Sequence, residues 1–514
     1  MVCIRAFKSK GKIYYGVVKT FRQNGKVRQE VLCYIGDQAK LTEFLLDKAK
    51  VRDFFSTDLE NLLYQTPISL WNLMEQMQFK EIFAKNFSKN WGVDAATAAC
   101  VMILNYATER QSKCRLKDWY AKTYLPHLLN VPAQKLNKDL LCRTMDFFTE
   151  EKIESIHAEI FKTAKELYGL SDKLLFYDIT AVTFEGNCCE LAKKGYNPNH
   201  SYGPQINLAM PVTVERFPAS HKVFEGSTKD VRTFRKSVEL VEKTGSIDKS
   251  VFIFDRGIVS DENLELLKSK HAQFICGLPK NSRIKKTIAL LKETDFTKID
   301  DDISFYEMKE KGHRLLLFWS KKLQDENKTF RDSRIKKIEQ KLTKLSRTAS
   351  RYEKPRLYEK IGQICGTYRR FFDVKTEPTF SFYINQKELD KASAIEGKYG
   401  ILTNTEFAPK EVLAHYRDRN FIEMSFKDLK FFVDIRPVRH WKESRVLTHV
   451  FMAVLAFGLR SVVELKVRRA GMQITSEEAI TQMNKVRALV SKGKVLRLTG
   501  ETEETKKISE ALKA

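Results

Sequence analysis

KLLFYDIT, residues 173–180, is a short apolar run that reaches an aspartate, and SVFIFDRG, residues 250–257, repeats the pattern. Apolar runs of this length fit strands that are buried in the middle of a sheet. Between them lie another strand-like run at 205–214 and a helical pattern at 230–243, and the strand-like AQFICGL follows at 272–278. This succession of strands and helices predicts an α/β fold built on a mixed sheet.

Each of the two opening runs is predicted to end in a carboxylate. Asp178 closes the first run and Asp255 closes the second. An aspartate at the close of a buried strand lies at the edge of the sheet, where open α/β sheets place their sites. Surface turns also use aspartate freely, so these two residues alone are weak evidence for a site.

A third carboxylate comes from HYRDRNFIEMSFKDLK, residues 415–430, which contains no proline or glycine and is predicted to be one helix. At about 100° per residue, four polar side chains of this helix share roughly 60° of arc: Tyr416, Arg419, Glu423 and Lys430. Two interpretations remain open. The stripe is either a solvated ladder in which Arg419 pairs with Glu423, because charge runs are usually solvated, or a functional stripe with partners elsewhere in the chain.

Asp178, Asp255 and Glu423 would supply three carboxylates from three separate elements. Hard oxygen ligands of this kind suit Mg²⁺ or Mn²⁺ rather than zinc. Two such ions, about 3.5–4 Å apart, can activate an attacking oxygen and stabilise a leaving one in phosphodiester chemistry. The sequence therefore predicts two Mg²⁺ ions as cofactors, for which Mn²⁺ can substitute.

Composition narrows the class of protein. The 514 residues carry a formal net charge of +25, which predicts a polyanionic partner, most commonly nucleic acid; a generally basic protein is the alternative. The length predicts several domains, and 43% apolar residues exclude a disordered chain. The nine cysteines include no C-x-x-C pair and the nine histidines have no metal-ligand spacing. These patterns indicate neither disulfides nor zinc, and we expect a reducing cytoplasm.

No membrane association is expected. The basic start of the chain lacks the apolar segment of a secretory signal. The most apolar stretch, VLTHVFMAVLAFGL at 446–459, is short for a membrane span and predicts a buried helix.

The four residues of the polar stripe have the spacing Y-x2-R-x3-E-x6-K. This spacing resembles the YREK signature of the DDE transposases of bacterial insertion sequences, in the group called the insertion sequence four family. Residues 178–180 (D-I-T) are similar to the D-x-T motif of that family, and residues 255–257 (D-R-G) to its D-x-G motif. KKGYNPNHSYGPQINLAM at 193–210 and the basic start also resemble one branch of these transposases. The resemblance covers about residues 3–465.

The resemblance implies an RNase H-like catalytic core in which Asp178, Asp255 and Glu423 bind the metal ions. It also implies that three further residues of the signature hold DNA phosphates near the cut: Tyr416, Arg419 and Lys430. The implied reaction is cleavage of double-stranded DNA at the transposon ends, followed by strand transfer of a freed 3′-hydroxyl into target DNA. The implied setting is a homodimer on DNA in the bacterial cytoplasm, associated with the nucleoid.

The patterns and the resemblance together predict an RNase H-like mixed-sheet core that an insertion domain interrupts and a mostly helical region precedes. The expected parts are a basic β-hairpin region (1–40), a helical N-terminal DNA-binding region (41–168), the first part of the core (169–280), the insertion domain (281–398), the second part of the core with the catalytic helix (399–468) and a C-terminal tail (469–514).

Two of these parts have alternative interpretations. The hairpin, with a turn at Gln23-Asn24-Gly25, could dock on a phosphate backbone or could cap the fold with a solvated face. In the insertion domain, an apolar stripe at coiled-coil spacing is more often a packing seam than a dimer zipper: Ile335, Ile338, Leu342 and Leu345.

Two alternative functions come from the same residues. An RNase H-like nuclease or resolvase would cut DNA without joining it. A non-catalytic DNA-binding protein descended from a transposase would have lost one of the acids. The chain retains all three acids and the basic residues of the signature, which favours transposition.

Overall fold

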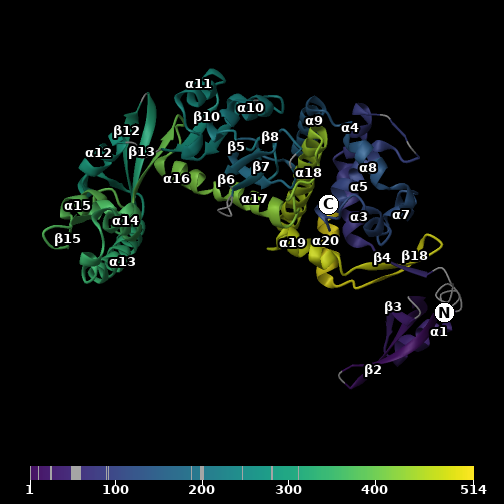
Figure 1. Ribbon diagram of the computed structural model, residues 1–514. Coiled ribbons are helices and arrows are strands. Elements are labelled where there is room, and N and C mark those ends of the chain that lie inside the picture. Colours follow the sequence, from purple (N-terminus) through teal and green to yellow (C-terminus); the bar gives the residue numbers. More distant parts are fainter. Residues whose placement is uncertain are drawn as a thin grey trace. The chain divides into compact units, whose positions relative to one another are not determined.

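The structure is a computed structural model that describes residues 2–9, 11–23, 26–47, 59–87, 89–90, 92–186, 188–196, 202–245, 247–278, 282–310 and 312–513. The chain divides into two compact units, whose elements are labelled in Figure 1. Met1–Ser250 and Asn420–Ala514 form one unit, called here the terminal unit. Val251–Arg419 forms the other, called the central unit.

The terminal unit begins with a three-stranded antiparallel sheet in the order β1 (Val2–Ser9), β2 (Lys12–Gln23) and β3 (Lys26–Gly36). The predicted hairpin therefore has a third strand. Gln23 lies opposite Lys26 in the register of β2 and β3, and residues 24–25 of the predicted turn lie outside the described residues. Helix α1 (Gln38–Leu46) follows, and its Phe44 packs into the buried cluster under this sheet.

The region predicted to be helical contains seven α-helices in its described part. These are α3 (Gln65–Gln76), α4 (Phe79–Asn86), α5 (Ala95–Ala107), α6 (Leu116–Tyr120), α7 (Leu125–Leu128), α8 (Lys138–Met145) and α9 (Glu150–Tyr168). One strand was not predicted: β4 (Leu59–Leu63), which pairs with β17 (Arg487–Ser491), itself paired with β18 (Lys494–Thr499). The sequence of β4, LENLL, has no β-branched residue and therefore no local strand signal.

The centre of the terminal unit is α18 (Glu443–Arg469), which runs beside α5 and α9 in Figure 1. By length and composition α18 could cross a membrane, but 94% of its apolar window is buried inside the protein. The prediction of a buried helix at 446–459 is thus confirmed. Two further helices, α19 (Ser476–Met483) and α20 (Glu503–Lys513), pack against α3 and α18.

A buried histidine pair lies beside α18. The Nε2 atom of His157 lies 3.0 Å from the Pro218 carbonyl oxygen, which can only accept, so Nε2 carries the proton. In the neutral ring Nδ1 is then an acceptor, and it accepts from Nδ1 of His221 at 2.8 Å. Burial lowers the pKa of His157 to about 4 and that of His221 well below its usual value.

This pair makes stability depend on pH. Because the pKa of His157 is depressed in the folded state, the unfolded chain binds more protons between pH 4 and 6.5. The stability is present above pH 6.5 and is lost as the pH falls towards 4. We expect the free energy of unfolding to drop by at least about 2 kcal/mol between pH 7 and 5, because burial also lowers the pKa values of His440 and His449 in the same unit. Chemical denaturation at both pH values measures this.

The control for that measurement is His127→Gln, which removes a half-exposed histidine of the same unit. The variant should keep the acid-induced loss of the unmodified protein. A free energy of unfolding that is constant from pH 7 to 5 in the unmodified protein would contradict the expectation.

The terminal unit also contains β5 (Leu174–Thr183), which pairs antiparallel with β7 (Tyr202–Val212). On β7 lie two short partners, β6 (Lys193–Tyr196) and β8 (Lys222–Glu225), and α10 (Asp230–Glu242) packs against this sheet. Asp178 lies in the middle of β5, opposite Met210, so the prediction that it ends the strand is wrong. The β-branched residues at 179, 180, 182 and 183 extend the strand beyond it.

The central unit contains a mixed sheet in the order β11-β12-β13-β16-β10-β9. Its strands are β9 (Val251–Phe254), β10 (Gln273–Gly277), β11 (Thr297–Lys298), β12 (Ile303–Glu310), β13 (His313–Ser320) and β16 (Lys398–Thr403). Strands β9 and β10 are parallel, and the other pairs are antiparallel. Helix α11 (Asp261–Ser269) follows β9 and is capped by Ser260. The predicted mixed α/β fold is confirmed.

The remaining elements of the central unit are α12 (Ser282–Leu290), α13 (Lys321–Ser346), α14 (Lys354–Cys365), β14 (Phe372–Lys375), β15 (Ser381–Ile384), α15 (Gln386–Ser393) and α16 (Pro409–Arg417). The predicted apolar stripe of α13 is buried against Leu357 and Ile361 of α14, so it is a packing seam. The β12–β13 pair lies within the range predicted for the insertion domain, and it belongs to the same sheet as β10 and β16.

Short 3₁₀ helices complete both units: η1 (Ala133–Lys135), η2 (Ile247–Lys249), η3 (Arg256–Ile258), η4 (Glu293–Asp295), η5 (Ala349–Arg351) and η6 (Gly366–Phe371).

Candidate active site

Asp255 lies at the carboxyl end of β9, as predicted, and directly precedes η3. Its Oδ1 atom accepts hydrogen bonds from Nη1 of Arg419 at 2.7 Å and from the Tyr416 hydroxyl at 3.3 Å. Both partners belong to the predicted polar stripe. The central unit therefore brings together three of the six predicted site residues, which we call the Asp255 cluster.

Arg419 and Tyr416 also contact each other. Nη1 of Arg419 donates to the Tyr416 hydroxyl oxygen at 3.3 Å, and the guanidinium carbon lies 5.3 Å from the centre of the tyrosine ring. Burial raises the pKa of Tyr416 to about 12, although the Arg419 charge opposes this. Tyr416 is therefore a neutral hydroxyl donor at physiological pH, and both side chains hold the carboxylate of Asp255 in place.

The helix predicted across 415–430 is interrupted, so that prediction is wrong. Helix α16 ends at Arg417, residues 418–419 form a turn, and α17 (Asn420–Phe431) begins after it. Asp418 and Asn420 explain the break, because short polar side chains compete with the helix backbone for hydrogen bonds. Glu423 and Lys430 consequently lie on α17 in the terminal unit, while Tyr416 and Arg419 belong to the central unit.

Gly277, the last residue of β10, provides the space for the Asp255 cluster. A Cβ atom at this position would lie 2.2 Å from the Tyr416 hydroxyl oxygen and 3.4 Å from Oδ1 of Asp255. The first distance is far below van der Waals contact, so any side chain at 277 must displace Tyr416.

We expect Gly277→Ala to cost about 1–2 kcal/mol of stability, because the added methyl group overpacks the site. The paired variant Gly277→Ala/Tyr416→Phe removes the clashing oxygen and leaves the ring carbon at 3.1 Å. It should recover part of the stability lost in Gly277→Ala. Thermal unfolding of the two variants tests this, and equal melting temperatures would contradict it.

In the terminal unit, α17 lies along one face of β5. Phe176, Asp178 and Thr180 alternate along the strand and therefore share a face. The ring of Phe176 meets Phe421 of α17 edge-on at 5.6 Å, and the Lys430 ammonium hydrogen-bonds to the Thr180 hydroxyl. Contacts to α17 thus flank Asp178 on both sides along this face.

Lys430 and Glu423 occupy different environments on α17. Burial lowers the pKa of Lys430 to about 8, and the Arg436 charge adds to this, whereas Asp178 opposes it. Glu423 is exposed. Among the residues that the structure describes, neither unit holds three Asp, Glu, His or Cys side chains close enough together to bind a metal ion.

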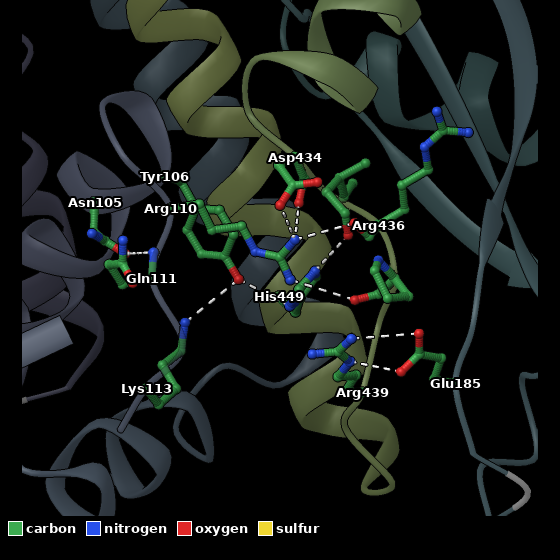
Figure 2. A network of polar contacts seen from close by, with 12 residues as sticks. Asn105, Tyr106, Arg110, Gln111, Lys113, Glu185, Asp434, Arg436, Arg439 and His449 are labelled. Carbon is green, nitrogen blue, oxygen red and sulfur yellow. Dashed lines mark hydrogen bonds and ion pairs between the residues drawn. The ribbon is translucent and has the colours of Figure 1, made fainter. Parts of the chain in front are cut away.

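The segment after α17 is held by residues that sequence analysis missed (Figure 2). Arg110 pairs with the Asp434 carboxylate at 2.8 Å and donates to the carbonyl oxygens of Arg436 at 3.2 Å and Pro437 at 3.4 Å. Arg439 pairs with Glu185 at 2.7 Å. The residues that pair with or accept hydrogen bonds from Arg110 here are more than 300 positions away in the sequence, so no local pattern reveals them.

Tyr106 and His449 also help to hold this segment (Figure 2). Nε2 of His449 lies 2.8 Å from the Ile435 carbonyl oxygen and therefore carries the proton, so Nδ1 accepts from the Tyr106 hydroxyl at 2.9 Å. The Val438 N–H donates to the Thr183 carbonyl oxygen at 3.1 Å, at the end of β5. These bonds fix the chain that leaves Lys430 against the strand that carries Asp178.

Arg216 is a second anchor of α17. Its guanidinium pairs with Asp428 of α17 and lies 3.6 Å from Glu464 of α18. Its carbonyl oxygen accepts from the Ser461 hydroxyl at 3.1 Å. Arg216 is 9% exposed, so the charge is compensated almost entirely by these carboxylates, and the helix that carries Glu423 is tied to the core.

The carboxylate of Asp255 is suited to binding a hard metal ion. Within the described part of the chain, both of its contacts fall on Oδ1 and neither involves Oδ2. The side chain is 44% exposed, so a hydrated cation can reach the second oxygen. Carboxylate oxygen is the ligand that Mg²⁺ and Mn²⁺ prefer.

Residues 169–459, more than half of the chain, match the family model described as "Transposase DDE domain". The chain therefore belongs to the family of transposase DDE domains, and the match includes all six predicted site residues. The prediction of a DDE transposase is confirmed at this level, whereas the insertion sequence four family and its YREK signature stay predictions.

The chain is also similar to a solved structure, the cryo-EM structure of the piggyBac transposase synaptic complex with hairpin DNA. The identity is 10%, the similarity covers 84% of this chain and 82% of that chain, and the TM-score is 0.41. No curated protein matches the chain.

Proposed function

We propose that this protein is the transposase of a bacterial insertion sequence, which cleaves DNA at the ends of its element and transfers the freed strands into target DNA. The observation that carries the proposal is the transposase DDE-domain match over residues 169–459. That span contains the D-x-T, D-x-G and YREK motifs in the order expected for the insertion sequence four family.

In this proposal Asp178, Asp255 and Glu423 hold two Mg²⁺ ions, for which Mn²⁺ can substitute. Bound ions would supply Lewis-acid stabilisation and an activated oxygen for phosphodiester cleavage. The exposed carboxylates of Asp255 and Glu423 support this role. So does the position of Asp178, on a strand face flanked by contacts to the helix that carries Glu423.

The basic residues hold the DNA. Arg419 and Lys430, with Tyr416, bind phosphates beside the cut, and Arg419 and Tyr416 also orient Asp255. A guanidinium has five N–H donors, so the contact of Arg419 with Asp255 is compatible with a phosphate contact. The partner is double-stranded DNA, both the terminal inverted repeats and the target. The protein acts as a homodimer on this DNA in the bacterial cytoplasm, at the nucleoid.

The test uses the full chain and a duplex that carries the DNA flanking its coding region. With Mg²⁺ or Mn²⁺ the protein should cut at the element ends and join them to a target plasmid, and a chelator should stop both steps. Cleavage without joining would favour a nuclease or resolvase. Binding of the ends without any cleavage would favour a non-catalytic DNA-binding protein.

A further inference from the structure

One face of α13 carries a row of exposed cations. The row recurs at spacings of three and four residues, which places its members on one side of the helix: Arg334, Lys337, Lys341 and Lys344. The neighbouring apolar stripe of α13 is buried against α14. The row therefore lies on a helix whose other contacts are already made, and its charges are not needed for packing.

The row lines a groove of about 550 Å³ in the central unit. The opposite side of the groove comes from the end of α14 and from η6, with Gln363, Thr367 and Tyr368 among its residues. No aspartate or glutamate lines it. Within the described residues, no ion pair joins any of the four cations to a carboxylate, so the groove concentrates uncompensated positive charge.

We propose that this groove, which none of the six candidate site residues lines, binds the phosphate backbone of DNA. The inference rests on the proposed function in taking DNA as the polyanion. Ten residues separate Arg334 from Lys344, which is about 15 Å along a helix. One strand of B-DNA presents a phosphate every 3.4 Å or so along its axis, so a row of this length extends over about four base pairs.

An aromatic contact fixes one end of the row. The Arg334 guanidinium carbon lies 5.5 Å from the centre of the Phe330 ring, which is itself 60% exposed. This contact restricts the Arg334 guanidinium, so less rotamer freedom remains to be lost when it binds a phosphate. Phosphate contacts carry no base information, so the groove should bind end and random DNA alike.

The experiment measures the affinity of the full chain for a short duplex by fluorescence anisotropy at several salt concentrations. Each phosphate contact contributes about −0.9 to the slope of log K against log salt. Replacing all four cations of the row by glutamine should flatten the slope by about 3–4, and Lys337→Gln/Lys341→Gln should flatten it by about 2, on both DNAs. These positions are exposed, so thermal unfolding should be nearly unchanged.

The matched control is Lys328→Gln/Lys336→Gln, which removes the same charge from other faces of α13. It should change the slope by less than about 0.5, because it removes no phosphate contact. Equal changes of the slope in the two double variants would overturn the proposal that the groove binds DNA, since the charges would then act only at long range. An unchanged slope in the row variants would also overturn it and would point to another occupant, such as an acidic peptide or a second copy.

The groove and the proposed function can fail separately. If the unmodified protein does not cleave its element ends but the row variants flatten the slope, the transposase proposal fails and the groove stands. If the unmodified protein cleaves and the row variants bind with an unchanged slope, the groove alone fails.

Discussion

Alanine at Asp178, Asp255 or Glu423 is expected to abolish strand cleavage, with a loss of at least about 1,000-fold, while DNA binding stays nearly intact. A bound metal ion stabilises charge in the transition state by several kcal/mol, and about 4 kcal/mol corresponds to that factor. DNA binding depends instead on the basic surface of a chain with a net charge of +25. Single-turnover cleavage of the element ends and gel-shift affinity measure the two properties separately.

Asp255→Asn sharpens this expectation, because an amide oxygen can still accept from Tyr416 and Arg419. The variant keeps the shape of the Asp255 cluster but loses the charge that attracts a cation, so it should be as inactive as Asp255→Ala. Glu262→Ala, at an exposed acid in the first turn of α11, is the control and should cleave normally. Near-normal cleavage in any of the three alanine variants would remove that residue from the metal site.

Local patterns predicted the elements that carry the acids better than they predicted their ends. Four consecutive buried residues define β9 and place Asp255 at its end. The corresponding prediction for Asp178 is wrong. The β-branched residues that follow Asp178 continue β5, whereas the sequence analysis placed the end of the strand at Asp178. The presence of a buried strand can thus be predicted from its apolar residues, whereas the position of its last residue depends on the pairing of β5 with β7.

The contacts that anchor α17 could not be predicted. A helical wheel treats residues 415–430 as one rigid cylinder, and the turn at 418–419 invalidates it. Asp418 and Asn420 favour such a break, but their presence alone does not fix where a helix ends. Arg110 and Arg216 find their partners through tertiary packing, across hundreds of positions in the chain. The residue types were visible in the sequence, but only the fold shows which charges they compensate.

Lys430 distinguishes most clearly between the two interpretations of the polar stripe, a solvated ladder or a functional stripe. Burial of its charged ammonium costs free energy, and a solvated ladder gives no reason for that cost. The pKa of Lys430 is lowered to about 8 by burial, which means that the folded protein disfavours its charge. Arg436 lies close enough to lower this pKa further, and Asp178 opposes the shift. A side chain retained only for stability would not need this charge. A DNA phosphate bound beside Asp178 would stabilise the charged ammonium of Lys430.

We therefore expect Lys430→Met, which keeps the length of the side chain, to lower cleavage about 100-fold, the range found when one charge-stabilising donor is removed from an active site. The melting temperature should stay the same or rise, because the variant removes a desolvated charge and loses only the hydrogen bond to Thr180. Lys427→Met, at an exposed position of the same helix, is the matched control and should leave both properties unchanged. Normal cleavage by Lys430→Met at the cognate ends would show that no phosphate depends on this ammonium. A large fall in its melting temperature would show that Lys430 supports the fold instead.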